Sequence, residues 1–415
     1  MDLVSLIVFC CVIAAAFVFK VNTGYMAIFA ALVLAHIGGV SEKWLISSFG
    51  SSLFIMLLGV MYLFCIAQEN KTLDVLAKKV IALCKGKVRL FPMILFLIGA
   101  VLSAIGPGLI SVTALMAAII VALAKQTGCD PIRLLPFGTL GAFAGGLSPI
   151  TPSGIVALTT SAQSGIEGIV LPLNIAMIIT NLLFSAILYF FVFKWHKYQI
   201  AAPAQKETDN VPAFTPIQWV TLSGIIAVAL LTAFFNVNVG LAAISVSVIL
   251  TVIHAADESA AMKKVPWNTL VMITGVGIMI SLVTELGGID LLSRALSSLV
   301  GAKTASAVMA VLAGCMSWFS SASGVVMPTL IPTVPEIAGS LQGVSTVSVT
   351  VALCVGAHMA ALSPLSSCGA LMLSAYSTSG EISAKERNRV FGQLFAMSAA
   401  GVAFSAVLAL LGLYR

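Results

Sequence analysis

Long apolar runs follow one another along the chain, and short polar segments separate them. A helix of about 20 apolar residues spans a bilayer, and the sequence contains candidates for such helices at residues 3–19, 24–40, 51–68, 132–163, 171–193, 217–235, 239–254, 267–285, 345–377 and 390–413. Two further apolar runs, at 90–125 and 304–340, are too long for one span and are interrupted at "IGPG" and "SSASG". Each of these two runs predicts either a pair of spans or a re-entrant hairpin.

The two longest apolar runs contain related polar octapeptides near their middles. "LSPITPSG" occupies residues 147–154, and "LSPLSSCG" occupies residues 362–369. Proline lacks the N–H that a helix requires and clashes with the preceding turn. Each octapeptide therefore predicts a helix that is broken inside the membrane. The backbone groups freed by such a break must be packed in protein or line a cavity, because lipid cannot satisfy them.

The octapeptides belong to a longer internal repeat. "VNTG" at 21–24 matches "VNVG" at 237–240, and the same offset of 216 residues carries Glu69 and Asp74 onto Glu285 and Asp290. The "GPG" of the first interrupted run falls on the "ASG" of the second without a gap. We therefore expect two repeats, at residues 1–194 and 217–415, joined by a polar cytoplasmic linker at 195–216. Each repeat contains an interrupted run and a broken helix.

Composition and charge indicate how these segments cross the membrane. The chain of 415 residues is 60% hydrophobic and 9% charged, with a mean hydropathy of +1.11, whereas soluble domains carry about 25% charged residues. If both interrupted runs are hairpins, 17 of the 21 basic residues lie on one side, which the positive-inside rule makes cytoplasmic. The net charge of +6 then reflects membrane sidedness and gives no reason to expect a nucleic-acid partner.

The prediction is an all-α polytopic membrane protein with about ten spanning helices, two re-entrant hairpins and two broken helices, and with both termini outside. Five spans in each half invert the second repeat relative to the first. The amphipathic segments 71–85 and 287–300 are expected to lie along the membrane surface. Inverted repeats with broken helices are the architecture of secondary transporters, whose site lies near the bilayer midplane. We therefore expect four segments to converge on a site: 103–108, 147–153, 320–324 and 362–368.

The titratable residues favour one kind of coupling. All 15 acidic residues lie in loops, at predicted span ends or in a hairpin arm, and no Lys or Arg is placed in the middle of a span. Hydroxyls and backbone carbonyls suit sodium, so sodium coupling is favoured over proton coupling. His358, five residues before Ser363, is the intramembrane exception. A proton-coupled organic-anion carrier or an anion exchanger that uses His358 is therefore the alternative. A neutral His358 that is hydrogen-bonded to a neighbouring helix is equally compatible with the sequence.

Two other classes of protein fit the sequence less well than a transporter does. A channel requires a continuous polar lining, and the predicted spans show few polar stripes. An intramembrane hydrolase requires a base beside its nucleophile. Only His358 near Ser363 fits that requirement, and the sequence shows no third member of a triad. The prediction is a carrier and not an enzyme.

The segment "SSLFIMLLGVMYLFCIAQENKTLDVLAKK", followed by the "IGPG" hairpin and the Ser-Pro break, resembles the MatC-type dicarboxylate (malonate) carriers. The plan of the whole chain resembles the divalent anion:sodium symporters of the ion transporter superfamily. This resemblance implies symport of a small di- or monocarboxylate anion with Na⁺ as the coupling ion and no organic cofactor. It also implies a multi-pass protein of the plasma membrane (the inner membrane in bacteria), in contact with the lipid bilayer, that forms a homodimer.

Carried onto this sequence, the family's hydroxyl-proline breaks and hairpin tips give the candidate site. The expected substrate contacts are Gly106, Pro107, Ser148, Pro149, Thr151, Ser153, Ser321, Ser323, His358, Ser363, Pro364 and Ser366. The expected sodium ligands, mostly through main-chain carbonyls, are Ser103, Leu147, Ser320 and Leu362. The tips depart from the family pattern, because "SAIGPG" contains neither Asn nor Thr and "FSSASG" contains no amide side chain.

Overall fold

The computed structural model describes residues 1–19, 21–82, 91–127, 130–191, 213–235, 237–377 and 383–414, and every regular element within them is helical. The first half contains α1 (Asp2–Phe19), α2 (Thr23–Gly38), α3 (Glu42–Ser47), α4 (Ser51–Glu69), α5 (Thr72–Ala82), α6 (Phe91–Ala104), α7 (Gly108–Thr127), η2 (Pro131–Arg133), α8 (Leu135–Gly145), α9 (Pro152–Gln163) and α10 (Val170–Phe191). The second half contains α12 (Pro216–Phe235), α13 (Val239–Val252), α14 (Glu258–Lys264), α15 (Trp267–Glu285), α16 (Gly288–Leu299), α17 (Ala305–Phe319), η3 (Ala322–Val326), α18 (Met327–Leu330), η4 (Ile331–Thr333), α19 (Val334–Ser340), α20 (Thr346–Met359), η5 (Ala360–Leu362), α21 (Ser367–Ser377) and α22 (Ala384–Leu410).

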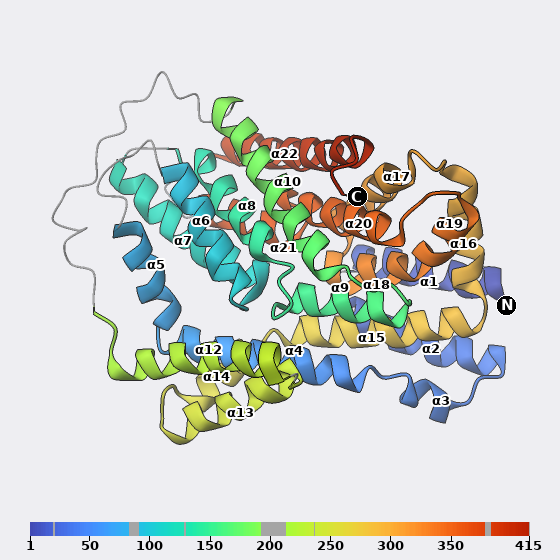
Figure 1. Ribbon diagram of the computed structural model, residues 1–415, viewed down its shortest axis with the longest axis horizontal. Helices are drawn as coiled ribbons and strands as arrows, with labels where there is room; N and C mark the ends of the chain where they lie inside the picture. Colours follow the sequence, from blue (N-terminus) through green and yellow to red (C-terminus); the bar gives the residue numbers. More distant parts are fainter. Residues whose placement is uncertain are drawn as a thin grey trace.

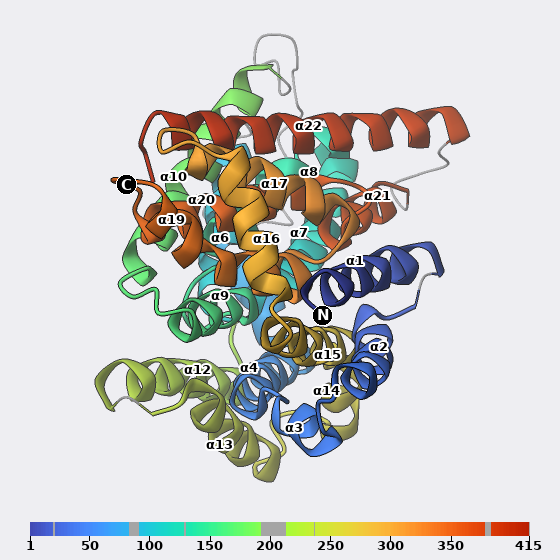
Figure 2. The same ribbon diagram turned by 90° about the vertical axis from the view of Figure 1, so that its right-hand side faces the viewer.

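The helices form two layers (Figures 1 and 2). One layer contains α2, α3 and α4 from the first half and α12 to α15 from the second half. The other layer contains α6, α7, α8 and α10 together with α17, α20, α21 and α22. Both halves of the chain contribute to both layers, so neither half forms a separate body.

Close helix crossings join the two halves within the first layer. Gly24 of α2 lies against the backbone of α15, where an added Cβ would be 2.1 Å from the Val271 carbonyl oxygen. Gly59 of α4 lies against α13 in the same way, with 2.2 Å to the Gly240 carbonyl oxygen. Such small residues allow helix backbones to approach closely in membrane proteins. The "VNTG" and "VNVG" motifs therefore each contribute a glycine to one of two matched crossings.

Five helices of the described residues are long and apolar enough to cross a membrane, or six when a bent pair counts as one span. The five are Glu42–Glu69, Val170–Phe191, Trp267–Glu285, Thr346–Ser377 and Lys385–Leu410. The other apolar helices of the described residues offer stretches of 10–17 residues, such as Asp2–Ala16 and Val239–Val252. The expected total of about ten spans and the inverted orientation of the second half stay predictions.

Both interrupted runs form two arms around a turn. In the first run, α6 and α7 are joined by the short turn at residues 105–107. In the second run, α17 and the helical segment Ala322–Ser340 meet at an angle of 119°. The second arm changes from π-helix to α-helix to 3-10 helix, because Pro328, Pro332 and Pro335 remove N–H groups along it.

The two amphipathic segments form helices at the expected places. Helix α5 covers Thr72–Ala82 of the predicted 71–85, whose last three residues lie outside the described part, and α16 covers Gly288–Leu299 of the predicted 287–300. Each helix follows a residue with left-handed backbone: Lys71 has φ 61° and Gly287 has φ 80°. These residues are 216 positions apart, so the corner has the same backbone form in both halves. Most of the predicted linker, residues 195–212, also lies outside the described part.

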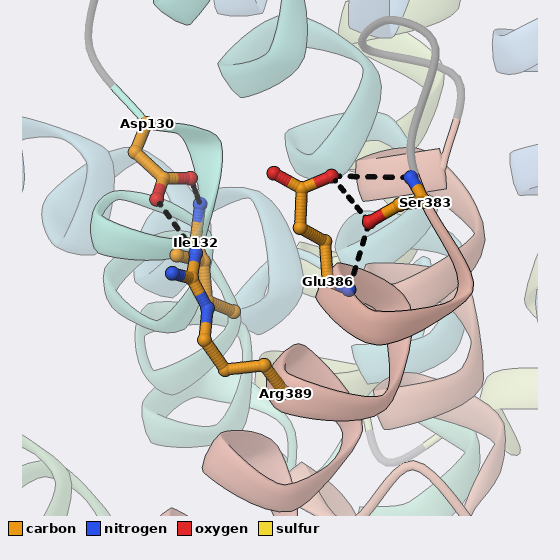
Figure 3. A network of polar contacts seen from close by, with 5 residues as sticks. All are labelled: Asp130, Ile132, Ser383, Glu386 and Arg389. Atoms are coloured by element: carbon orange, nitrogen blue, oxygen red, sulfur yellow. Dashed lines mark hydrogen bonds and ion pairs between the residues drawn. The ribbon is translucent and has the colours of Figure 1, made fainter.

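A polar network connects the start of α22 to the approach to α8 (Figure 3). The Ser383 hydroxyl accepts the Glu386 N–H at 3.2 Å, and the Glu386 carboxylate accepts the Ser383 N–H at 3.1 Å, which together form a capping box. Arg389 lies 3.7 Å from the Asp130 carboxylate, and Asp130 also caps the N–H of Ile132 at 3.3 Å. The network joins segments from both halves at the same end of the molecule.

Candidate substrate site

The first predicted break separates α8 from α9, and one threonine holds its two ends together. The Thr151 hydroxyl donates toward the carbonyl oxygens of Gly146 at 2.7 Å and Ser148 at 2.8 Å. It also accepts the N–H of Gly154 at 3.1 Å, which caps α9. Thr151 is fully buried. Its only hydroxyl proton is used within the protein, so Thr151 fixes the shape of the break.

The second break repeats this arrangement at an offset of 215 residues. The Ser366 hydroxyl donates toward the carbonyl oxygens of Ala361 at 2.6 Å and Ser363 at 2.7 Å, and it accepts the Gly369 N–H at 3.3 Å. An added Cβ on Gly369 would lie 1.9 Å from the Ser363 carbonyl oxygen, and Gly154 has the same relation to Ser148 in the first break. The shared Gly of the two octapeptides is therefore required by close backbone contact.

The serines of the two Ser-Pro pairs differ in their surroundings. Ser148 is partly exposed, whereas Ser363 is fully buried and its hydroxyl accepts the Leu365 N–H at 3.2 Å. The adjacent residues Leu147 and Leu362, which were expected to present carbonyls to sodium, are fully buried. Ser148 is thus the more accessible of the two hydroxyls.

The hairpin tips lie against the long helices of the other layer. Gly106 has φ +132° and packs on the Phe64 ring of α4, so an added Cβ would overlap that ring. At the second tip, the Ser321 hydroxyl caps the Gly324 N–H at 3.0 Å, and the Ser320 hydroxyl donates to the Met316 carbonyl oxygen at 2.8 Å. The Ser103 hydroxyl beside the first tip is buried and has no hydrogen-bond partner among the described residues.

A cavity of about 120 Å³ lies where the first tip, the first break and the second tip meet. Pro107, Ser153 and Ser323 line it, one from each of these three segments. The other predicted substrate contacts do not belong to its described lining: Gly106, Ser148, Pro149, Thr151, Ser321, His358, Ser363, Pro364 and Ser366. The structure therefore brings three of the twelve residues together around one space, and the substrate-binding role of all twelve stays a prediction.

Sequence reasoning did not identify the wall that faces this cavity. Helix α4 contributes Met61, Phe64, Cys65 and Gln68, which recur at the spacing of one helix face. Three of these four side chains are apolar, so their pattern in the sequence is the same as that of an ordinary buried stripe. Gln68 is the only polar residue of this stripe, and its place near the polar end of a span was the one available signal.

His358 lies in α20, four residues before the second break. Its Nδ1 lies 2.8 Å from the Cys354 carbonyl oxygen of the preceding turn. The side chain is fully buried, and Nε2 has no hydrogen-bond partner among the described residues. The observed bond lies within α20, whereas the structural interpretation of His358 expected a bond to a neighbouring helix. The role of His358 in coupling stays a prediction.

Charged side chains occur at one end of the cavity. Lys264 and Asp74 are part of its lining, and the Lys264 ammonium forms an ion pair with the Glu69 carboxylate at 2.5 Å. In the described residues, no group of three or more His, Cys, Asp or Glu side chains is placed to hold a metal ion. A sodium site would depend on carbonyl and hydroxyl oxygens.

A serine also holds the second hairpin against the second break. The Ser398 hydroxyl of α22 accepts the Trp318 indole N–H at 2.9 Å and donates to the Ala360 carbonyl oxygen at 2.8 Å. Trp318 lies two residues before the second tip, and Ala360 begins the turn of the break. One hydroxyl therefore connects both segments to α22.

Paired hairpins and broken helices around a cavity define a membrane transporter, not an enzyme. The sequence model of the citrate transporter family (CitMHS) matches residues 6–356, and the chain belongs to this family. The resemblance to malonate carriers had pointed to a different specificity, which the family match does not confirm. A search of curated proteins gave no match.

The fold is similar to that of a solved transporter. The crystal structure of the YdaH transporter from Alcanivorax borkumensis, described as having an unusual topology, superposes with a TM-score of 0.59 at 14% sequence identity. The similarity covers 88% of this chain and 86% of that one. At this identity the similarity concerns the fold alone.

Proposed function

We propose that this protein is a sodium-coupled symporter of a small carboxylate anion of the citrate type. The observation that carries the proposal is the cavity in which Pro107, Ser153 and Ser323 meet. Residues of two hairpin tips and one helix break line this one space, and Ser153 and Ser323 bring hydroxyls to it. In alternating access, the elements on one side of such a site move against those on the other side.

The polar groups around the cavity suit an anion with several carboxylates. Helix N-terminal ends favour negative charge, and α7 and α9 both begin beside the cavity at Gly108 and Pro152. Ser111, Ser153 and Ser323 add hydroxyls that are able to donate to carboxylate oxygens. Citrate, malonate and other di- and tricarboxylates share these recognition features, so the substrate is proposed as a class.

Sodium is proposed as the coupling ion because hard oxygen ligands are abundant near the breaks while buried carboxylates are not. Unwound backbone and the C-terminal ends of half-helices present carbonyl oxygens to small cations. Leu147 and Leu362 are the proposed carbonyl donors, with Ser103 and Ser320 beside the tips. The protein is proposed to reside in the plasma membrane with both termini outside, and a homodimer stays a prediction from the resemblance.

Proton coupling through His358 is the second candidate. The observation in its favour is the buried Nε2, which lacks a partner in the described part of the chain. An ionisable group within a membrane span is a functional candidate by default. A proton taken up by His358 would add a positive charge near the second break while an anion is bound.

One experiment separates the two coupling ions. Purified protein in proteoliposomes would be given radiolabelled citrate, malonate or succinate under an imposed sodium gradient at equal pH, or under a pH gradient with choline in place of sodium. We expect uptake of at least one of these anions only with the sodium gradient, and nearly unchanged coupling in His358→Gln. If the pH gradient alone drives uptake, and if this uptake is lost in His358→Gln, then the coupling ion is the proton and not sodium. No uptake of any of the anions under either gradient would refute the proposed function.

A further inference from the structure

The described lining of the cavity combines uncharged residues of the hairpin tips and the first break with two charged side chains. Its polar lining near the tips and breaks consists of serine hydroxyls, whereas Lys264 and Asp74 are its only charged residues among those described. Among the described residues, Lys264 is therefore the one cation in the lining that an anion in this cavity would meet. The substrate and sodium contacts proposed above do not include Lys264.

The position of Lys264 follows from the helix that forms the cavity wall. The α4 stripe runs from Met61 to Gln68, and seven residues at 1.5 Å each extend about 10 Å. Glu69 follows Gln68 at the end of α4 and pairs with Lys264 from the last turn of α14. Phe64, against which the first tip packs, lies five residues before Glu69 in α4, or about 7.5 Å along the helix. Because the Lys264 and Glu69 side chains are both partly exposed, we call this part of the cavity its mouth.

This charge occurs in one half of the chain only. Position 48, which lies 216 residues before Lys264, is a serine, while Glu69 has its counterpart in Glu285. The other side of the predicted repeat therefore has the acid without the lysine. A function that depends on Lys264 would act from one side of the membrane.

The ion pair between Lys264 and Glu69 is weak enough for another carboxylate to take the place of Glu69. The side chain of Lys264 is 42% exposed and that of Glu69 is 26% exposed. Pairs of such exposure contribute little to stability, with a median of about 0–1 kcal/mol. A carboxylate that arrives from solution is therefore able to compete with Glu69 for the ammonium group. Without the lysine, the charge in the described cavity lining would be that of Asp74 alone.

We propose that Lys264 is the first binding residue for the anion on the side where α14 lies, and that Glu69 is its internal competitor. One carboxylate of the substrate displaces Glu69 from the ammonium group, and the anion then moves inward to the tips. This inference rests on the proposed function, because it requires an anionic substrate. Lys264 acts in capture and contacts the substrate only at the mouth.

The test compares initial rates of labelled citrate-type anion uptake into vesicles of both orientations. The variants are Lys264→Gln, Lys264→Arg and Glu69→Gln, with Lys263→Gln as the matched control because Lys263 lies next to Lys264 and lines a different hollow. From the α14 side, Lys264→Gln is expected to raise KM about 5- to 20-fold with little change in maximal rate, as for a partly exposed charge-assisted bond. Lys264→Arg keeps the positive charge, so its KM should be close to that of the wild type. Glu69→Gln removes the competing carboxylate, so its KM should be lower than that of the wild type.

The opposite signs of the two charge variants distinguish capture from support of the fold. A purely structural ion pair would make Lys264→Gln and Glu69→Gln reduce thermal stability and transport alike. That result would overturn the inference, as would equal effects from both sides of the membrane or an equal effect of Lys263→Gln. If the wild-type protein transports the anion and Lys264→Gln does not change KM, only this inference fails. If the wild-type protein transports no di- or tricarboxylate, the proposed function fails and this inference fails with it.

Discussion

Replacement of Thr151 by valine is expected to weaken the first break while it keeps the side-chain packing there. Valine has the same branching as threonine, so the packing of this fully buried side chain is kept while its hydroxyl is lost. The Gly154 N–H, which the hydroxyl accepts at 3.1 Å, then has no side-chain partner at the start of α9. The Gly146 and Ser148 carbonyl oxygens lose a donor at 2.7 and 2.8 Å.

The size of the effect follows from these bonds. A lost N-cap costs about 0.5–2 kcal/mol, and a buried polar group left unpaired costs about 1–3 kcal/mol. Thr151→Val is therefore expected to destabilise the protein by about 2–4 kcal/mol. Thr151→Ser is the matched control, because serine fills the same place in the second break at Ser366. It keeps the hydroxyl and loses one methyl group, at about 0.8 kcal/mol.

The assay is thermal unfolding of both purified variants in detergent, followed by transport in proteoliposomes at equal protein density. Thr151→Val should unfold at a clearly lower temperature than Thr151→Ser and should transport more slowly, because the break presents its backbone groups less precisely. Thr151→Ser should remain close to the wild type. Equal stability and equal transport in the two variants would refute the assigned role of the hydroxyl. A loss of affinity alone, at full stability, would instead favour direct contact with the substrate.

Three further changes test separate parts of the structure. Ser398→Ala leaves the Trp318 indole N–H and the Ala360 carbonyl oxygen without their bonds, at about 1–3 kcal/mol; unchanged unfolding temperature would contradict this. Lys71→Gly removes the strain of a left-handed backbone at φ 61° and should stabilise the folded protein by about 0.5–1 kcal/mol. A lower unfolding temperature in this variant would contradict the prediction. Gly106→Ala places a Cβ within an aromatic ring at φ +132° and should abolish uptake, and normal uptake would show that the tip is adaptable.

The positions of the breaks and hairpins were predictable because proline and glycine act locally. The structure ends α8 at Gly145, two residues before the first octapeptide, and begins α9 at Pro152 within it. Likewise, the turn at 105–107 falls on "IGPG". A missing N–H or a left-handed backbone limits the chain wherever it occurs, so these signals do not depend on tertiary contacts.

The different roles of the hydroxyl side chains within the two octapeptides were not predictable. In the sequence, nothing distinguishes the hydroxyls of Thr151 and Ser366 from those of Ser148 and Ser153. Only the folded breaks show that the two capping hydroxyls are bonded to backbone groups. The same holds for the α4 wall, since an apolar stripe indicates burial but does not indicate what it faces. Lys264 gave no signal because its place at the mouth depends on how α14 packs beside α4.

The most direct test of the central claim is whether substrate occupies the cavity between the tips and the first break. A variant with Ser153→Cys as its only cysteine would be treated with a thiol-reactive reagent in the presence of increasing citrate, with sodium and with choline. The account predicts that the transported anion slows modification of position 153 with a half-maximal concentration close to the KM for uptake, and does so more effectively with sodium. A variant that still transports the anion but shows the same modification rate at saturating substrate would contradict the account, because the substrate would then bind elsewhere.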